Sequence, residues 1–482
     1  MGVPGCAHPG GLEVAPVLPV ADVEDRPRRR GILTESSSDQ HAFARRPHRT
    51  LLALSFPVLV SLIAEPLTGL ADAAFIARLG TIPLAGLGIG TAVLSSIFWA
   101  FNFLGIGTQT AVAHAEGTGT RPRGRDAAGL AMALGGAIGC ALALIGFVTL
   151  DIALVFMSDD AEIQSAADIY LAIRLLGGPA ILITMAAFGA LRGLQDMRTP
   201  LAIALAQNAL NIALDAVLIF GFGPIPAFGI AGAAWASVVS QWLGALWAID
   251  AVRRGLGLPR QIHWRGARNL LLVGRDLFFR TGSLILFIVL TTRAATLLGA
   301  DEGAAHHVIR QFWILSALLL DAFGAAAQSL IGFFLGAGQV LYARRAAAIA
   351  CIWGTGTGVV LTIGMLVASG SVAEAFLPPE VHALFSAAWI AFALAQPANA
   401  LAFVTDGIHW GTSDYRFLRN AMVASTGAGL IALYWIDPTG PNALTVIWLI
   451  TAGWIAIRTL FGMARIWPGF GASPLKLPHG QP

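Results

Sequence analysis

Residues 51–77 read LLALSFPVLVSLIAEPLTGLADAAFIA, and this stretch decides the fold class. It is long and apolar, and its only charged residues are Glu65 and Asp72. Because a helix of about 20 residues crosses the hydrocarbon core of a bilayer, the stretch predicts a membrane-spanning helix. A helix also satisfies its backbone amides within its own segment, so helices are the expected architecture inside a membrane.

The same apolar character extends along the whole chain. Of its 482 residues, 56% are hydrophobic and 12% are charged, and the mean hydropathy is +0.72. Soluble domains carry about 25% charged residues, so a water-soluble fold could not hide this much apolar surface. Further long apolar stretches lie at residues 127–156, 284–299 and 343–369. The composition therefore predicts an all-α integral membrane protein.

Basic residues gather after every second predicted span. Seven arginines precede the first span, and later basic clusters lie at positions 121–125, 192–198, 253–275, 344–345, 416–419 and 458–476. The intervening connections are mostly acidic, with Arg78 as the clear basic exception. Positively charged loops mark the cytoplasmic side of a membrane protein. The pattern predicts twelve transmembrane helices with both termini in the cytoplasm.

The two halves of the membrane part resemble each other. A shift of 219 residues aligns them without a gap and places Gln109 on Gln328 and Asn102 on Asp321. Such parallel repeats are typical of transporters with two pseudo-symmetric six-helix lobes. We expect a first lobe at residues 49–257, a cytoplasmic linker at 258–275, a second lobe at 276–466 and a cytoplasmic C-terminal tail at 467–482.

Residues 1–48 are rich in proline, glycine, serine and charge, which predicts a flexible cytoplasmic tail. An organellar transit peptide is the alternative. Such peptides are poor in acidic residues, whereas this segment contains Glu13, Asp22, Glu24 and Asp25. The tail interpretation is therefore favoured.

The first span carries a polar stripe. An ionised side chain at the centre of a spanning helix raises the free energy of membrane insertion by about 2.5–3.5 kcal/mol, so it is expected to have either an interaction partner or a functional role. Glu65 and Asp72 are seven residues apart, which places them on one helix face with Thr68 between them. Pro66 removes an amide donor beside Glu65 and predisposes the helix to bend.

Asp72 has two possible roles. A carboxyl group that is shielded from water can exchange protons near physiological pH, which would make this residue functional. It could instead be the structural partner of Arg78 or Arg293. We favour the functional role, and for Glu65 a functional and a structural role are equally supported.

The fifth span presents Asn208, Asn211 and Asp215 along one face. Asparagines in spans commonly bond neighbouring helices, so the two amides alone do not indicate a site. The carboxylate beside them favours a functional face.

Ionisable residues of the second half have less distinct patterns. His306 and His307 are expected at a solvated helix end beside Asp301, and Asp406 at a cytoplasmic helix end. Asp321 is expected to face inward. The further candidates for a cavity lining are Glu65, Thr68, Asn102, Asn208, Arg293 and Asp321.

Several functional classes lack a signature. Cys6, Cys140 and Cys351 are too far apart for a metal-binding spacing, and no nucleotide-binding loop or paired acidic motif is present. We therefore expect no enzyme activity, no cofactor, no resident metal and no nucleic-acid partner.

Five stretches together resemble a known family, the multidrug and toxic compound extrusion (MATE) family in its DinF branch. They are EPLTGLADAAFIARLGTIPLAGLGIGT (65–91), GALRGLQDMRTPL (189–201), NIALDAVLIFGFG (211–223), GIAGAAWASVVSQ (229–241) and DGIHWGTSDYRFLRNAM (406–422). No one of them is unique to the family, but their order and spacing are specific. The resemblance covers residues 45–465.

The resemblance implies twelve helices in two lobes and export of amphipathic, often cationic, compounds driven by inward flow of H⁺ or Na⁺. It implies a cation-coupling site at Asp72 in GLADAAF and at Asn211 and Asp215 in NIALD. A bend of the first helix at Pro66 is also implied. Small-molecule substrates and membrane lipids are the expected partners, and the protein is expected to function as a monomer.

Two other hypotheses remain beside cation-coupled antiport. A flippase for lipid-linked precursors would need a strongly cationic central cavity, whereas the expected spans hold few arginines, namely Arg174, Arg293 and Arg310. A membrane-embedded enzyme would need motifs that are absent. The arginine-rich, lysine-poor composition is typical of a GC-rich bacterial genome and so indicates the bacterial plasma membrane.

Overall fold

The computed structural model describes residues 41–437, 440, 442–467 and 469–477. Ala42–Pro482 form one compact unit, and the regular elements of its described residues are helices. The expected N-terminal tail lies outside the described residues as far as residue 40, and so do residues 478–482 of the expected C-terminal tail.

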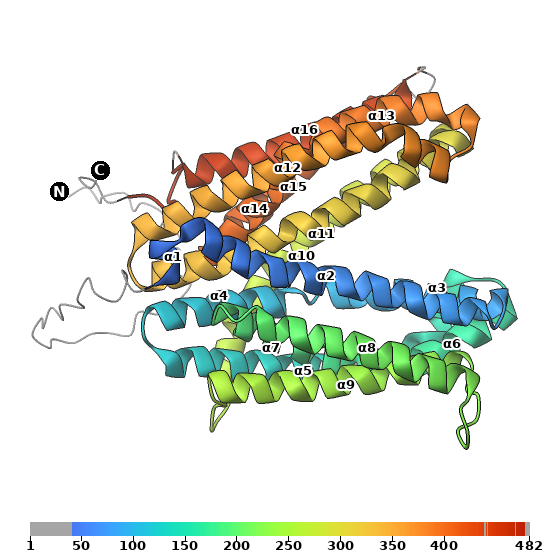
Figure 1. Ribbon diagram of the computed structural model, residues 1–482, viewed down its shortest axis with the longest axis horizontal. Coiled ribbons are helices and arrows are strands. Elements are labelled where there is room, and N and C mark those ends of the chain that lie inside the picture. Colours follow the sequence, from blue (N-terminus) through green and yellow to red (C-terminus); the bar gives the residue numbers. More distant parts are fainter. Residues whose placement is uncertain (1–40, 438–439, 441, 468, 478–482) are drawn as a thin grey trace, which may run out of the picture. The chain divides into compact units, whose positions relative to one another are not determined.

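Six long elements build the first bundle, and two of them consist of paired helices (Figure 1). After the short helix α1 (Ala42–Arg45), they are α2 (Pro47–Ala77), α3 (Thr81–Trp99) with α4 (Phe103–Gly117), α5 (Arg121–Met157), α6 (Ala161–Leu175) with α7 (Gly178–Gly193), α8 (Arg198–Phe220) and α9 (Ile230–Gly255). Although it contains Pro57 and Pro66, α2 is a single uninterrupted helix.

Six long elements also build the second bundle. After a short 3₁₀ turn η1 (Trp264–Gly266), they are α10 (Ala267–Leu298), α11 (Ala300–Gly336), α12 (Val340–Phe376), α13 (His382–Leu394) with α14 (Gln396–Gly411), α15 (Tyr415–Tyr434) and α16 (Ala443–Ile466); a second 3₁₀ turn, η2 (Pro379–Val381), precedes α13. Because α10 begins at Ala267, the helix takes up part of the expected linker at 258–275.

The elements agree with the twelve-helix expectation. By length and composition, eight helices of the described residues could cross a membrane, or ten if each of two bent pairs counts as one span. The remaining elements, α9 and α15, have 26 and 20 residues and are also long enough, but less apolar. An all-α membrane fold of two six-element bundles is thus confirmed.

The bent pairs occupy matching places in the two bundles. Between α6 and α7 the chain turns by 49°, and between α13 and α14 by 46°. Pro179 and Pro397 lie in the first turn of the second helix of each pair. Proline has no amide hydrogen and disfavours a continuous helix before it, so the sequence itself sets these bends.

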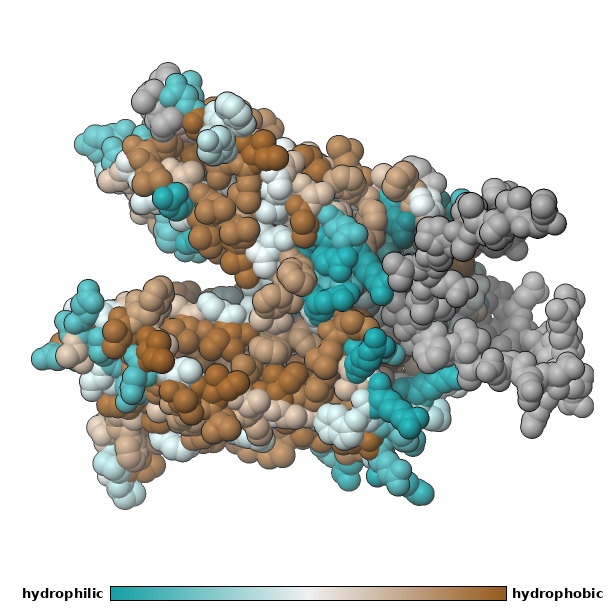
Figure 2. Space-filling view, turned by 180° about the vertical axis from the view of Figure 1, so that it is seen from behind, coloured by the Kyte–Doolittle hydropathy of each residue, from teal (hydrophilic) through white to brown (hydrophobic). Residues whose placement is uncertain are grey.

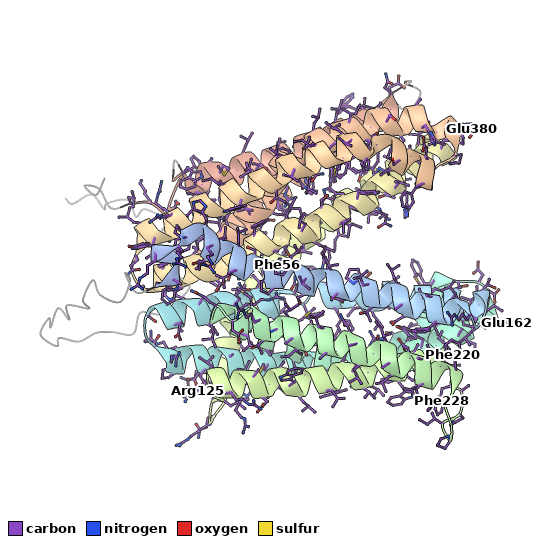
Figure 3. The ribbon with its side chains drawn as sticks, in the orientation of Figure 1. Phe56, Arg125, Glu162, Phe220, Phe228 and Glu380 are labelled. Atoms are coloured by element: carbon purple, nitrogen blue, oxygen red, sulfur yellow. The ribbon has the colours of Figure 1, made fainter. Side chains whose placement is uncertain are left out.

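The two bundles lie close at one end of the unit and diverge toward the other, where a cleft separates them (Figure 2). Glu162 and Glu380 lie at the open end, whereas Arg125 lies at the closed end (Figure 3). The connections α4–α5, α9–α10 and α11–α12 are at the closed end (Figure 1). The basic clusters at 121–125, 253–275 and 344–345 therefore share one end of the molecule.

Two glutamines join the bundles at the closed end. The amide of Gln109 on α4 donates to the carbonyl oxygen of Ala325 on α11 (2.8 Å), and the amide of Gln328 donates to the carbonyl oxygen of Ile106 (2.8 Å). Since the repeat shift of 219 residues carries 106 to 325 and 109 to 328, the two bonds are equivalent. Both glutamines are buried. We call this contact of α4 with α11 the seam.

Glycines allow the seam to close. A Cβ atom on Gly117 would overlap the carbonyl oxygen of Phe333, and one on Gly336 would overlap the carbonyl oxygen of His114. These contacts are again related by the repeat shift. Because the opposing atoms belong to the backbone, a side chain here could not be relieved by a rotamer change.

We expect Gly117→Ala and Gly336→Ala each to destabilise the described fold by about 1–3 kcal/mol, because the new Cβ atom forces α4 and α11 apart. The measurement is the midpoint of thermal aggregation in detergent, read by size-exclusion chromatography. Gly364→Ala is the control, since a Cβ atom at this helical position meets nothing within 4 Å. Equal midpoints for the seam and control variants would contradict the close approach.

Candidate functional site

The first bundle brings three of the predicted site residues together. Asp72 on α2 is half-buried, and α2 packs along α8 (Figure 1), which carries Asn211 and Asp215 one helical turn apart. The side chains of Asn211 and Asp215 face inward, with 4% and 0% of their surface exposed. Two spans far apart in the sequence thus place their polar faces against each other.

Asn211 connects three helices. In the amide orientation that satisfies both of its polar ends, its nitrogen donates to Asp72 Oδ1 (3.1 Å) and its oxygen accepts from the backbone N–H of Ser237 on α9 (3.1 Å). The amide therefore fixes the position of the Asp72 carboxyl group relative to α8 and α9. The structure thus shows the interhelical bonding role that the sequence left open for this asparagine, and the bonded partner is the candidate site residue Asp72.

Asp215 has no hydrogen-bond donor in the described part of the chain, at either oxygen. The carboxyl group of Asp72 interacts electrostatically with that of Asp215. Two carboxylates cannot bond each other, but a carboxyl group and a carboxylate can share one proton in an O–H···O bond. Carboxylate and amide oxygens in this arrangement could hold a proton or a small metal ion.

Arg174 on α6 supplies positive charge near this pair without an ion pair to it. The guanidinium interacts electrostatically with Glu65, Asp72 and Asp215. Its Nη1 donates to Gln241 Oε1 (2.8 Å), and its Cζ lies 6.0 Å from the ring centre of Tyr170. The local charge of two acids and one arginine is close to balanced once one proton is bound.

Sequence reasoning did not assign Arg174, Tyr170 or Ser237 to the site. Arg174 had a usable signal, since an arginine within a span needs a partner. Tyr170 and Ser237 had none, because neutral polar residues are common in packed helices.

The other candidates make no hydrogen bond to this pair in the described residues. Glu65 shares the electrostatic interaction with Arg174, but its side chain is exposed. The Thr68 hydroxyl donates to the Ala64 carbonyl (3.0 Å) within α2. Asn208 is half-buried on α8. Asn102 is exposed at the break between α3 and α4, and Arg293 is exposed on α10.

Neither structural alternative for Asp72 is realised in the described residues. No ion pair joins its carboxyl group to Arg78 or Arg293; the hydrogen-bonding side chain is that of Asn211. The same residues contain no group of three or more histidine, cysteine or acidic side chains that could hold a metal ion.

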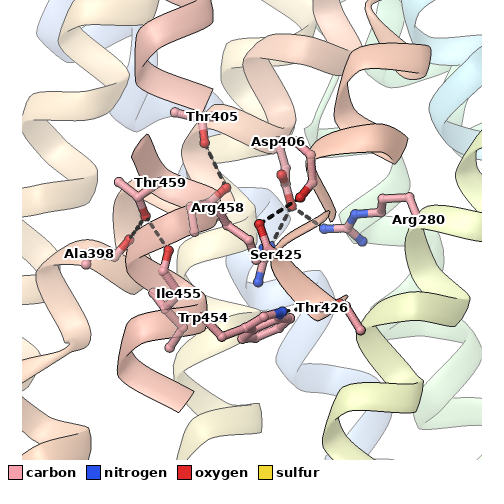
Figure 4. Close-up of polar contacts among 12 residues, drawn as sticks. Arg280, Ala398, Thr405, Asp406, Ser425, Thr426, Trp454, Ile455, Arg458 and Thr459 are labelled. Atoms are coloured by element: carbon pink, nitrogen blue, oxygen red, sulfur yellow. Dashed lines mark hydrogen bonds and ion pairs between the residues drawn. The ribbon is translucent and has the colours of Figure 1, made fainter. Parts of the chain in front are cut away.

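The second bundle holds a buried charge cluster that differs from the expectation (Figure 4). Asp406 was expected at a cytoplasmic helix end, but only 3% of it is exposed. Its Oδ2 accepts from Arg280 on α10 and from Arg458 Nη2 on α16 (3.0 Å). Helix packing places this turn of α14 inside the bundle. Arg458, counted with the basic cluster after the last span, is buried as well, and its guanidinium lies 4.6 Å from the Trp454 ring centre.

Asp321 on α11 lies between this cluster and the first bundle. It is half-buried and interacts electrostatically with Arg280, Arg192 and Asp406. Its repeat partner Asn102 lies in a break between helices, whereas Asp321 belongs to a continuous helix. The two bundles are therefore alike in fold and different in the chemistry of their interiors.

We expect Asp406→Asn to destabilise the protein by about 3–5 kcal/mol, because it leaves two buried guanidinium groups without a counter-charge. Thermal aggregation in detergent measures the loss. Asp301→Asn, which removes an exposed carboxylate at the open end of α11, is the control. A small effect of Asp406→Asn, equal to that of the control, would show that the cluster is not a charge-balanced unit.

Comparison with known proteins identifies the family. The family model described as MatE matches residues 57–217 and 282–435, one segment in each bundle. The protein DETOXIFICATION 44, chloroplastic, from Arabidopsis thaliana is 30% identical over 90% of this chain and 84% of its own length. The DNA damage-inducible protein F of Escherichia coli (strain K12) is 28% identical over 88% of this chain and 93% of its own length.

Solved structures show the same fold. A crystal structure of MATE in the bent conformation superimposes with a TM-score of 0.77 at 20% identity, covering 87% of this chain and 95% of that chain. The matched segments, the extent of the relatives and the paired six-helix architecture agree with the resemblance seen in the sequence. This chain belongs to the MatE family of multidrug and toxic compound extrusion transporters, in its DinF branch.

Proposed function

We propose that the protein is a secondary active exporter that exchanges amphipathic or cationic compounds for inward-moving H⁺ or Na⁺ by alternating access. The observation that carries the proposal is Asp215, a fully buried carboxyl group that lacks a donor and faces Asp72. Such a group is costly inside a membrane unless it binds a cation. The coupling site consists of Asp72, Asn211 and Asp215.

Cation binding at this pair would change how α2 and α8 pack. With both carboxyl groups ionised, like charges repel across the helix contact, whereas one bound cation draws them together. Each charge that crosses the membrane contributes about 2.3 kcal/mol per 100 mV, which is enough to support a useful gradient. Protons and Na⁺ are both compatible with carboxylate and amide oxygens.

Helix α2 connects the proposed cation site to the second bundle. Leu51, near the start of α2, packs with Leu330 and Phe334 of α11, while Asp72 near its end faces α8. A change at Asp72 therefore acts on a helix anchored in both bundles. Pro57 and Pro66 lie between the two contacts and remove backbone hydrogen bonds, so they mark where α2 would bend.

The sidedness of the cleft fits an exporter in its outward-open state. The seam shuts the end that carries the basic clusters, and the positive-inside rule places that end in the cytoplasm. We place the protein in the bacterial plasma membrane, with both termini cytoplasmic, and propose that it functions as a monomer without a cofactor. The name of one relative includes the word chloroplastic, so an organellar membrane is the second candidate.

A flippase for lipid-linked precursors is the alternative function. It needs a cationic cavity, and the helices contain three further arginines, the half-buried Arg192 and the buried Arg280 and Arg458. Two of them bind Asp406, which offsets much of their charge. The acidic pair of the first bundle favours cation-coupled export.

We expect Asp72→Asn and Asp215→Asn to abolish gradient-driven export of a fluorescent cationic dye while the protein stays folded. Asp215 has no bonds to lose, and an asparagine at position 72 keeps an oxygen that can accept from Asn211. The assay uses proteoliposomes with pH and sodium gradients imposed separately, so it also identifies the coupling ion. Asp159→Asn, in the exposed α5–α6 connection, is the control. Unchanged gradient-driven export by Asp72→Asn would refute the coupling site.

We expect a disulfide across the seam to block transport, because alternating access requires the closed end to open. A Cβ atom on Gly332 would lie 3.0 Å from that of Ala113, about 0.5 Å short of the usual spacing in a disulfide, so Ala113→Cys and Gly332→Cys can be joined after a small separation of α4 and α11, in a chain whose native cysteines are replaced. Oxidation should stop dye export and reduction should restore it, while either single cysteine should have no effect. Full export by the cross-linked protein would exclude opening at this seam.

A further inference from the structure

A pocket in the outer half of the second bundle lies between α10, α11 and α16. Its walls include Phe287, Trp313, Trp448 and Trp454, with His306 and Arg310 at the α11 side. Phe287 and Trp454 stack with ring centres 4.4 Å apart, and His306 lies 5.3 Å from the Trp448 ring centre. His306 was expected at a solvated helix end but is 3% exposed, because α16 covers it; His307 is exposed as expected.

Buried hydrogen-bond donors without partners line this pocket. In the described structure, no acceptor meets Nε–H of Arg310, Nε1–H of Trp313 or Nε1–H of Trp448. The two tryptophans are 7% and 3% exposed, so water does not satisfy these groups from the surface. A buried donor left without an acceptor destabilises the fold, and such groups call for an explanation. All three can only donate.

His306 adds a fourth polar atom. Its Nε2 lies 3.2 Å from the hydroxyl oxygen of Thr292, and that hydroxyl donates to the carbonyl of Ile288 (2.8 Å). The hydroxyl oxygen therefore accepts from Nε2–H, which leaves Nδ1 without a partner. The imidazole is thus held in place at the wall of the pocket.

The charge of the pocket favours an anion. No aspartate or glutamate lines it, and none of the ion pairs among the described residues involves Arg310. Aromatic walls alone could hold a cation, but the guanidinium of Arg310 would repel it.

We propose that this pocket is a second ligand site, which takes an aromatic carboxylate or another planar organic anion. Its carboxylate would accept from Arg310 and from the indole N–H groups of Trp313 and Trp448, and its ring would lie among the aromatic walls. The role of this pocket as a site for an exported substrate rests on the proposed export function. Binding of an anion to the pocket does not depend on that function. The free space of about 20 Å³ holds one water molecule, so the ligand enters when α10 and α16 separate.

Equilibrium dialysis of radiolabelled benzoate against the detergent-purified protein, with benzylamine as the cation of similar shape, tests the proposal without any gradient. Benzoate should bind and benzylamine should not. Arg310→Met should weaken benzoate binding by at least about tenfold, because it removes a charged hydrogen bond. Arg293→Met, at an exposed arginine of α10 outside the pocket, is the matched control and should bind as the parent does.

Trp448→Phe keeps an aromatic ring in the wall and removes the N–H group. It tests benzoate binding at this pocket if Arg310→Met does not fold. It should weaken benzoate binding several-fold and leave the size-exclusion profile unchanged. Equal benzoate binding by the parent and both pocket variants, or preference for benzylamine, would overturn the site. Benzoate binding that depends on Arg310 in a protein that exports no dye would uphold the site and reject the export function instead.

Discussion

The seam between α4 and α11 is the contact on which the rest of the structure depends. Gln109 and Gln328 bond the opposite backbone in equivalent ways, and glycines at equivalent positions bring the two helices together. Buried amides that are fully paired fix one register, because any shift would leave them unsatisfied. The two bundles are thus held at one end only, and the cleft at the other end is a consequence.

Helix α2 connects the second bundle, near this seam, to the acidic pair Asp72 and Asp215. Its start packs into the second bundle and its end packs on α8, so α2 belongs to both halves of the molecule. Asn211 fixes the Asp72 carboxyl group in place, whereas Asp215 is left without a donor. A helix that is anchored at both ends and meets an unsatisfied carboxyl group is well placed to respond to a bound cation.

The two bundles share a fold but enclose different polar groups. The first contains a buried carboxyl group that lacks a donor, Asp215, and the second contains buried tryptophan N–H groups that lack acceptors, those of Trp313 and Trp448. Asp406, the buried acid of the second bundle, is bound by two arginines and so is not a counterpart of Asp215. The sequence repeat accounts for the shared backbone, whereas the side chains that each bundle encloses differ.

Sequence alone determined the fold class, and it predicted the sidedness of the loops and the candidate coupling residues Asp72, Asn211 and Asp215, because hydropathy, charge placement and the energetic penalty of a buried carboxylate are all local properties of the chain. It also revealed the repeat, since Gln109 and Gln328 keep a constant spacing. Only the tertiary structure decided the partners. Arg174 beside the acidic pair, the burial of Asp406 and the enclosure of His306 by α16 depend on how helices distant in sequence pack, and no local pattern specifies which face of a uniformly apolar helix meets which neighbour.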